Sequence, residues 1–239
     1  MRGVPDPLLD VRDLYAGYGS LIVVRGVSFS VDEGTTTLIL GLNGAGKTTT
    51  LKAIAGIVRP VRGSIIFNRK NVTRWPPHAR AREGIVMITD NPVFPNMSVV
   101  DNIKLAASPR YYRDPGEAVK EALSYFTDLA KLANLKASAL SGGQRKMLAM
   151  AMAMVARPRL LLLDEPSTGL SPVMVLKVIS YVRKLKEMGI TILLAEQNPS
   201  FIELADHVMV MEMGRVKLYG AADEIGKLEE VRRTLFQVT

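Results

Sequence analysis

A glycine-rich segment near the start of the chain has residue types and a spacing suited to binding phosphate. Residues 41–48 read Gly-Leu-Asn-Gly-Ala-Gly-Lys-Thr and fit the pattern G-x-x-x-x-G-K-[ST] at every position. Glycine lets the backbone turn so that successive N–H groups point at one anion, which the positive end of a following helix also attracts. We expect Lys47 to reach the β- and γ-phosphates of a nucleotide and the Thr48 hydroxyl to bind Mg²⁺.

Two adjacent carboxylates follow a second apolar run. Residues 160–163 are all leucine, and Asp164 and Glu165 come directly after them. Open α/β sheets bind their ligands at the carboxyl ends of such strands. In a phosphate-loop protein, Asp164 is the expected Mg²⁺ partner, and Glu165 can orient or deprotonate an attacking water, which favours hydrolysis. The alternative is that both acids only open the turn at Pro166.

A third motif, Leu140-Ser141-Gly142-Gly143-Gln144, precedes an apolar helical stripe. Ser141 is predicted to cap the helix, and Gln144 is its reciprocal partner. Capping alone does not require two glycines, because glycine costs about 1 kcal/mol in a helix relative to alanine. We therefore expect this helix end to be a second phosphate-binding end, approached closely by the phosphate of another molecule.

The elements that must position these motifs alternate between strand and helix. Residues 37–40 have the pattern of a buried strand, and Leu51, Ile54, Ala55 and Val58 follow at helical spacing, with Arg59-Pro60 ending that helix. The strand at 27–31 alternates apolar and polar residues, which favours an antiparallel sheet packed on the nucleotide core. Further strands are predicted at 63–67, 84–89, 160–163 and 190–195, a helix at 172–188, and a hairpin at 208–219.

Between residues 91 and 157 the pattern is helical, without a strand candidate. Ser98 and Asp101 resemble a capping box, and Asp114-Pro115 opens another helix, whose apolar stripe is predicted to run on to Ala130. We therefore predict an all-α insertion at 91–157 within a nucleotide-binding core at 1–90 and 158–220. A helical edge is predicted at 221–239.

Composition narrows the class of protein. The chain has 239 residues and a net charge of +8. It has no cysteine, and this absence excludes disulfides, thiolate metal sites and cysteine nucleophiles. The basic residues are scattered, which favours a solvated surface over a lipid or nucleic-acid face. No apolar run of 18 residues is present, and residues 1–10 lack the apolar centre of a signal peptide. We expect a soluble intracellular protein, or one attached to a membrane only through a partner.

Together the three motifs resemble those of the ATP-binding subunits of ABC transporters, over essentially the whole chain. The segment at 167–172, Ser-Thr-Gly-Leu-Ser-Pro, is similar to the dimer-contact loop of that family. The resemblance implies an α/β fold with a P-loop NTPase core, an antiparallel β subdomain and an inserted α-helical subdomain. It also implies ATP and Mg²⁺ as ligands, and two subunits packed head to tail, so that each signature (Ser141, Gly142, Gly143, Gln144) completes the partner's ATP site.

The resemblance also assigns residues to roles. ATP binding falls to Gly41, Leu42, Asn43, Gly44, Ala45, Gly46, Lys47, Thr48 and Thr49, catalysis to Lys47 and Glu165, and metal binding to Thr48 and Asp164. Tyr18 matches the aromatic residue that stacks on adenine, although it could equally be a surface-loop tyrosine.

The chain departs from the family pattern at two positions. The usual glutamine after the strand ending near 89 is replaced by Thr89-Asp90, so either Thr89 or Asp90 takes the metal-ligand position. The usual γ-phosphate-sensing histidine is replaced by Gln197, which can hydrogen-bond a phosphate but cannot titrate near neutral pH. Gln197 is included among the expected catalytic residues, and slower or differently coupled hydrolysis is predicted.

The motif lengths and the run Ala-Glu-Gln-Asn at 195–198 are most similar to the second ATP-binding subunit of branched-chain amino-acid importers. That likeness implies a peripheral position on the cytoplasmic face of the cell membrane. The implied partners are an identical or sister ATP-binding subunit, transmembrane permeases and, indirectly, an extracytoplasmic solute-binding protein. No nucleic acid is expected. The acidic dipeptide and glycine that this subgroup often carries near position 90 are missing.

Two other functions remain open at this point. One is a soluble ATPase of the same superfamily acting in DNA repair or translation, for which long heptads or a tandem cassette would argue; neither is present. The other is a nucleotide-dependent assembly module that hydrolyses little ATP, which the unusual residues at 89–90 and 197 keep open.

Overall fold

A six-stranded sheet forms the centre of the molecule. The structure is a computed structural model and describes residues 6–89 and 93–225. The strand order is β10-β9-β3-β8-β7-β6, and every neighbouring pair is parallel except β9 and β10. The predicted buried strands and the hairpin are confirmed, with bounds β3 Thr36–Leu40, β6 Ile85–Ile88, β7 Leu160–Asp164, β8 Thr191–Glu196, β9 His207–Glu212 and β10 Arg215–Ala221.

An antiparallel sheet covers one face of this core, as the alternating pattern predicted. It has the order β2-β1-β4-β5, with β1 Leu9–Tyr18, β2 Leu21–Val31, β4 Arg62–Phe67 and β5 Lys70–Asn71. Its apolar face and helix α1 (Lys47–Ala55) bury one common cluster against the parallel sheet. Strand β1 was not predicted, because a bulge between Val11 and Leu14 shifts the apolar alternation by one residue.

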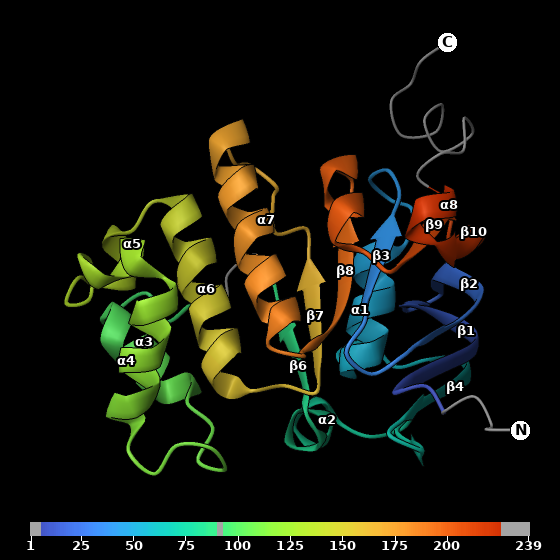
Figure 1. The fold of residues 1–239 in the computed structure, drawn as a ribbon. Coiled ribbons are helices and arrows are strands. Elements are labelled where there is room, and N and C mark those ends of the chain that lie inside the picture. The colour runs from blue at the N-terminus through green and yellow to red at the C-terminus, as the bar shows by residue number, and fades with distance from the viewer. Residues whose placement is uncertain (1–5, 90–92, 226–239) are drawn as a thin grey trace, which may run out of the picture.

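The segment between β6 and β7 is helical and lies on the other side of the sheet, at the left in Figure 1. Both predicted N-caps are confirmed: Ser98 accepts from the Asp101 N–H at 3.0 Å, and Asp114 accepts from the Gly116 N–H at 2.8 Å. The reciprocal half of the capping box at Ser98 is not formed, because the Asp101 carboxylate accepts from the Ser98 hydroxyl instead. Within the described residues, the helices beyond α1 are α2 Pro77–Glu83, α3 Val99–Ala106, α4 Pro115–Tyr125, α5 Thr127–Ala130, α6 Gly142–Ala156, α7 Pro172–Glu187 and α8 Ala222–Ile225, with short 3₁₀ turns at Ala137–Ala139 and Pro199–Leu204.

Two helix predictions were wrong in extent. Helix α1 ends at Ala55 rather than near Arg59, because Gly56 adopts the left-handed conformation (φ 81°) and caps it. The stripe predicted to run along one helix to Ala130 is interrupted at Phe126, whose φ of −111° and ψ of 64° separate α4 from α5. The turn lets Phe126 enter the core and pack against Tyr181, with tilted rings whose centroids are 4.6 Å apart, while Ala130 is exposed.

A buried arginine joins the end of α1 to α2. Arg80 is 1% exposed and donates to the carbonyl oxygens of Ala53 at 2.7 Å, Ile54 at 2.8 Å, Thr73 at 2.9 Å and Trp75 at 3.1 Å. Burial lowers the pKa of its guanidinium to about 10, so it is charged at neutral pH. The cation therefore neutralises the negative, carbonyl end of the phosphate-loop helix.

Two further predictions concern the C-terminal helix and membrane-spanning segments. Of the predicted helical edge at 221–239, Ala222–Ile225 is helical and residues 226–239 lie outside the described residues. None of the helices within the described ranges is long and apolar enough to cross a membrane.

Candidate functional site

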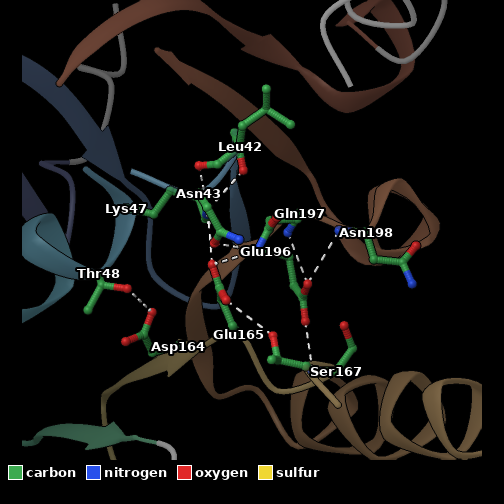
Figure 2. Close-up of polar contacts among 12 residues, drawn as sticks. Leu42, Asn43, Lys47, Thr48, Asp164, Glu165, Ser167, Glu196, Gln197 and Asn198 are labelled. Carbon is green, nitrogen blue, oxygen red and sulfur yellow. Dashed lines mark hydrogen bonds and ion pairs between the residues drawn. The ribbon is translucent and has the colours of Figure 1, made fainter. Parts of the chain in front are cut away.

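The carboxyl ends of three adjacent parallel strands bring the predicted motifs together. The phosphate loop follows β3, Asp164 ends β7 with Glu165 next to it, and Gln197 follows β8. Because β8 lies between β3 and β7, Gln197 falls between the phosphate loop and the two carboxylates (Figure 2). This strand order brings the phosphate loop together with two segments that lie more than 100 residues further along the chain.

The phosphate loop has the conformation that its glycines predict. Gly44 and Gly46 have φ angles of 80° and 101°, where a side chain would be strained, and a Cβ on Gly41 would lie 2.5 Å from the Met211 carbonyl oxygen. Gly46 is the N-cap of α1, and no side chain caps this helix. The first N–H groups of α1 therefore face a pocket of about 180 Å³, lined by Val23, Glu165 and residues 43–49.

Lys47 extends along the inside of the loop. Its Nζ donates to the Gly41 carbonyl at 2.8 Å and to the Leu42 carbonyl at 3.1 Å, and forms an ion pair with Glu165 Oε1 at 3.0 Å. The side chain is 3% exposed. The ammonium is thus buried at the base of the pocket and linked directly to the predicted catalytic carboxylate.

Glu165 is held from several directions. Its φ of 45° is unusual for a residue other than glycine. Its N–H donates to the Ala195 carbonyl at 2.9 Å, and Thr168 Oγ1 donates to its Oε2 at 3.1 Å. Burial raises the pKa of this carboxyl, but the hydrogen bond and charge of Lys47, with the donors Thr168 and Gln197, outweigh burial and hold the pKa below its usual value. Glu165 is therefore ionised at neutral pH.

Thr48 and Asp164 place two side-chain oxygen atoms next to each other. The Thr48 hydroxyl donates to Asp164 Oδ1 at 2.8 Å. Among the described residues there is no group of three or more histidine, cysteine or acidic side chains that could hold a metal alone. Mg²⁺ fits this chemistry, because it is bound in nucleotide sites by one or two protein oxygens together with phosphate oxygens and water. Thr89, just after β6, lies at the level of Asp164 in the parallel register, and Asp90 lies outside the described residues.

Gln197 bridges the two sides of the pocket. Its Nε2 donates to Asn43 Oδ1 at 2.8 Å and to Glu165 Oε1 at 3.2 Å. The side-chain amide thus connects the phosphate loop to the carboxylate (Figure 2). Gln197, which was predicted from the sequence to be a site residue, therefore contacts both Asn43 of the phosphate loop and Glu165.

The signature Ser141-Gly142-Gly143-Gln144 opens α6 and does not line this pocket. The predicted capping box is present: Gln144 N–H donates to Ser141 Oγ at 3.3 Å and Ser141 N–H to Gln144 Oε1 at 2.8 Å. A Cβ on Gly142 would meet no atom within 4 Å, and its φ is not positive, so nothing in this chain's described part requires glycine there.

Tyr18 ends β1 and is 50% exposed, and it does not line the phosphate pocket. Val23, on the neighbouring strand, does, and sequence analysis did not identify it. Three further residues near Glu165 were not among the predicted site residues: Glu196, which is buried, Thr168, and Lys146, whose Nζ donates to the Glu165 carbonyl at 3.2 Å. Only Glu196 has a recognisable signal in the sequence, since it is an acid directly after the apolar run at 192–195.

The sequence and the fold of this chain resemble those of known proteins. The sequence model of the family described as ABC transporter matches residues 24–168. The chain is 36% identical over 230 residues to the probable branched-chain amino acid transport ATP-binding protein LivF of Archaeoglobus fulgidus, covering 95% of this chain and 97% of the relative. It is also 36% identical over 222 residues to the lipopolysaccharide export system ATP-binding protein LptB of Acidithiobacillus ferridurans, covering 91% and 92%.

A solved structure shares the fold closely. MJ1267, an ATP-binding cassette of an ABC transporter, superimposes with a TM-score of 0.86 at 27% identity, covering 98% of this chain and 100% of that one. The P-loop NTPase fold and the ATPase activity predicted from the motifs are confirmed by these similarities. The chain belongs to the ABC transporter family and is an ATP-binding, ATP-hydrolysing subunit.

Proposed function

We propose that Glu165 is the general base for ATP hydrolysis at this pocket. The observation that supports this role is an ionised carboxylate at the mouth of a phosphate loop, linked to Lys47 at 3.0 Å and to Gln197 at 3.2 Å. Glu165 would take a proton from water as the water oxygen bonds to the γ-phosphorus and the bond from that phosphorus to the bridging oxygen of ADP breaks. Phosphate and ADP are the products.

The neighbouring groups would hold the nucleotide. The N–H groups of residues 43–49 and the Lys47 ammonium bind the phosphates, while Gln197 and Asn43 contact the γ-phosphate side. Thr48 and Asp164 would hold Mg²⁺, which neutralises charge on the phosphate oxygens. Thr89 or Asp90 would supply a further ligand. Tyr18, exposed beside β2, would stack on adenine.

A second ATP-binding subunit would complete the site. The first turn of α6 is capped by its own residues 141 and 144. No contact within the described part of the chain requires glycine at position 142. A phosphate of the partner's nucleotide approaching this backbone explains the residue, because a methyl group would keep the anion away from the N–H groups. The partner is either an identical chain or a sister subunit.

For the transported solute we propose a branched-chain amino acid, taken up by an importer. The 36% identity to LivF and the Gln197 position support this assignment; LptB, named for lipopolysaccharide export, is equally similar and is the competing substrate class. The chain would sit on the cytoplasmic face of the membrane and contact permease subunits through exposed apolar side chains, of which Phe94, Leu105 and Tyr111 lie between β6 and α4. A solute-binding protein would act on the other side.

Glu165→Gln tests the proposed base. The variant keeps the shape of the side chain and should bind Mg-ATP with wild-type affinity, while hydrolysis falls by about 100- to 10,000-fold. Because ATP persists, the variant should dimerise in Mg-ATP, alone or with a sister subunit, as measured by light scattering. Hydrolysis at the wild-type rate would remove Glu165 from the mechanism. A persistent monomer with no sister subunit would contradict the shared site.

The substrate class is tested in the assembled transporter. Tagged protein would be purified from native membranes with its bound permeases and reconstituted in liposomes. ATP hydrolysis should rise on addition of the cognate binding protein loaded with leucine, isoleucine or valine, and lipopolysaccharide should have no effect. Stimulation by lipopolysaccharide alone would assign the chain to export instead.

A further inference from the structure

Glu196 is a buried carboxylate that the reaction described above does not use. It ends β8, between β3 and β7, and is 1% exposed. Its Oε1 accepts from the Ser167 N–H at 2.8 Å, and its Oε2 accepts from the N–H groups of Gln197 at 3.0 Å and Asn198 at 3.3 Å. The two oxygens therefore bind two different loops, one after β7 and one after β8 (Figure 2).

The three backbone N–H groups around Glu196 explain why a carboxylate occupies this buried position. A buried carboxylate is costly unless hydrogen-bond donors surround it, and here three backbone N–H groups do so. Glutamine would have the same shape but only one accepting oxygen, and its NH₂ group would face a backbone N–H on one of the two loops. Only a carboxylate can hold both loops at once.

Both loops carry groups of the proposed catalytic apparatus. Ser167 lies two residues after Glu165 and next to Thr168, which donates to the Glu165 carboxylate at 3.1 Å. On the other loop, the Gln197 amide group donates to that carboxylate at 3.2 Å. The backbone N–H groups that Glu196 binds thus belong to the segments that orient Glu165 from two sides.

We infer that Glu196 is a positioning residue for hydrolysis, fixing the loop that holds Glu165 and Ser167 against the loop that holds Gln197. This inference rests on the roles proposed for Glu165 and Gln197. Glu196 does not line the phosphate pocket, so its loss should affect the chemical step rather than nucleotide binding. The ion pair between Lys47 and Glu165 does not involve Glu196.

Glu196→Gln in the full chain tests the inference. We expect kcat to fall about 10- to 100-fold, as for a catalytic group displaced by a fraction of an ångström to an ångström, with KM for Mg-ATP changed less than about threefold. Hydrogen exchange should show lost protection at the amide of Ser167 or at those of Gln197 and Asn198. An unfolded fraction would also lower the apparent kcat at constant KM, so kcat is calculated per folded molecule, counted by Mg-ATP binding.

Asp206→Asn is the matched control. Asp206 also accepts a backbone N–H, that of Thr36 at 2.8 Å, and pairs with Lys186 at 2.9 Å, but at the opposite end of the sheet. Its loss should lower the melting temperature and leave kcat unchanged. If the two variants lower kcat equally, the effect is one of general stability and the inference is overturned.

The remaining outcomes separate this inference from the proposed function. A folded Glu196→Gln variant with wild-type kcat would overturn the inference while an inactive Glu165→Gln would still support the proposed base. If Glu196→Gln does not fold, Glu196→Asp replaces it: the shorter carboxylate cannot reach both loops, so kcat should fall severalfold at constant KM. Wild-type kcat in the aspartate variant would again refute the role of Glu196.

Discussion

Replacing Gly142 by alanine should change stability and turnover in opposite directions. Gly142 is the first residue of α6, its φ is not positive, and an added Cβ would meet no atom within 4 Å. Glycine costs up to about 1 kcal/mol relative to alanine inside a helix, and we take about half of that at the first position. The variant should therefore gain about 0.5 kcal/mol and melt about 1–2 °C higher. Its ATPase rate, measured by phosphate release, should fall at least about tenfold, because the methyl group displaces the partner's phosphate.

Gly143 provides a contrast within the same motif. A Cβ there would lie 2.6 Å from the Met174 Cε, so alanine at 143 requires that flexible side chain to move and should bring no gain in melting temperature. Unchanged turnover of Gly142→Ala, in a preparation that melts at or above the wild-type temperature, would refute the reasoning. It would mean that no phosphate approaches the tip of α6.

Further variants and conditions test other parts of the site and fold. Gln197→His should raise turnover, because imidazole can titrate near neutral pH at a position within reach of Asn43; equal or lower turnover would argue against Gln197 as the substitute phosphate sensor. The kcat/KM for ATP should show no acid limb near neutral pH, since burial raises the pKa of Glu165 but Lys47 outweighs burial and holds that pKa below its usual value, so the base is ionised there. An acid limb of kcat/KM near pH 6.5 would point to another base. The lowered pKa of Glu165 also stabilises the fold: this contribution is present above the unfolded pKa and is lost as pH falls through the lower folded pKa. Phe126→Ala should lower the free energy of unfolding by about 3–5 kcal/mol in urea titrations, because it removes a fully buried ring packed on Tyr181; a loss below about 1 kcal/mol would contradict that packing.

The motifs and the strands that carry them could be predicted because each depends on local patterns. An apolar run followed by glycines or acids identifies the end of a buried strand, and Ser98, Asp114 and Ser141 identify helix starts. The contact of Gln197 with both Asn43 and Glu165 could not be predicted in the same way. It depends on β8 lying between β3 and β7, which is decided by packing of the whole sheet.

Local exceptions account for the elements that sequence analysis misjudged. The bulge in β1 hides a strand by changing the face on which apolar residues fall. Phe126 lies where a helical stripe would continue, yet its burial against Tyr181 favours a turn at that position. In both places tertiary packing overrides a local periodicity.

The guanidinium of Arg80 connects the end of the phosphate-loop helix to the neighbouring helix α2. Helix α1 has nine residues and is roughly 13 Å long, with the phosphate pocket at one end and Arg80 bound to its last carbonyls at the other. Arg80 belongs to α2, and only Gly84 separates α2 from the edge strand β6. A small tilt of α1 on phosphate binding would therefore be transmitted through Arg80 and α2 to the start of β6. The edge of the sheet could then respond to the nucleotide while the intervening elements stay folded.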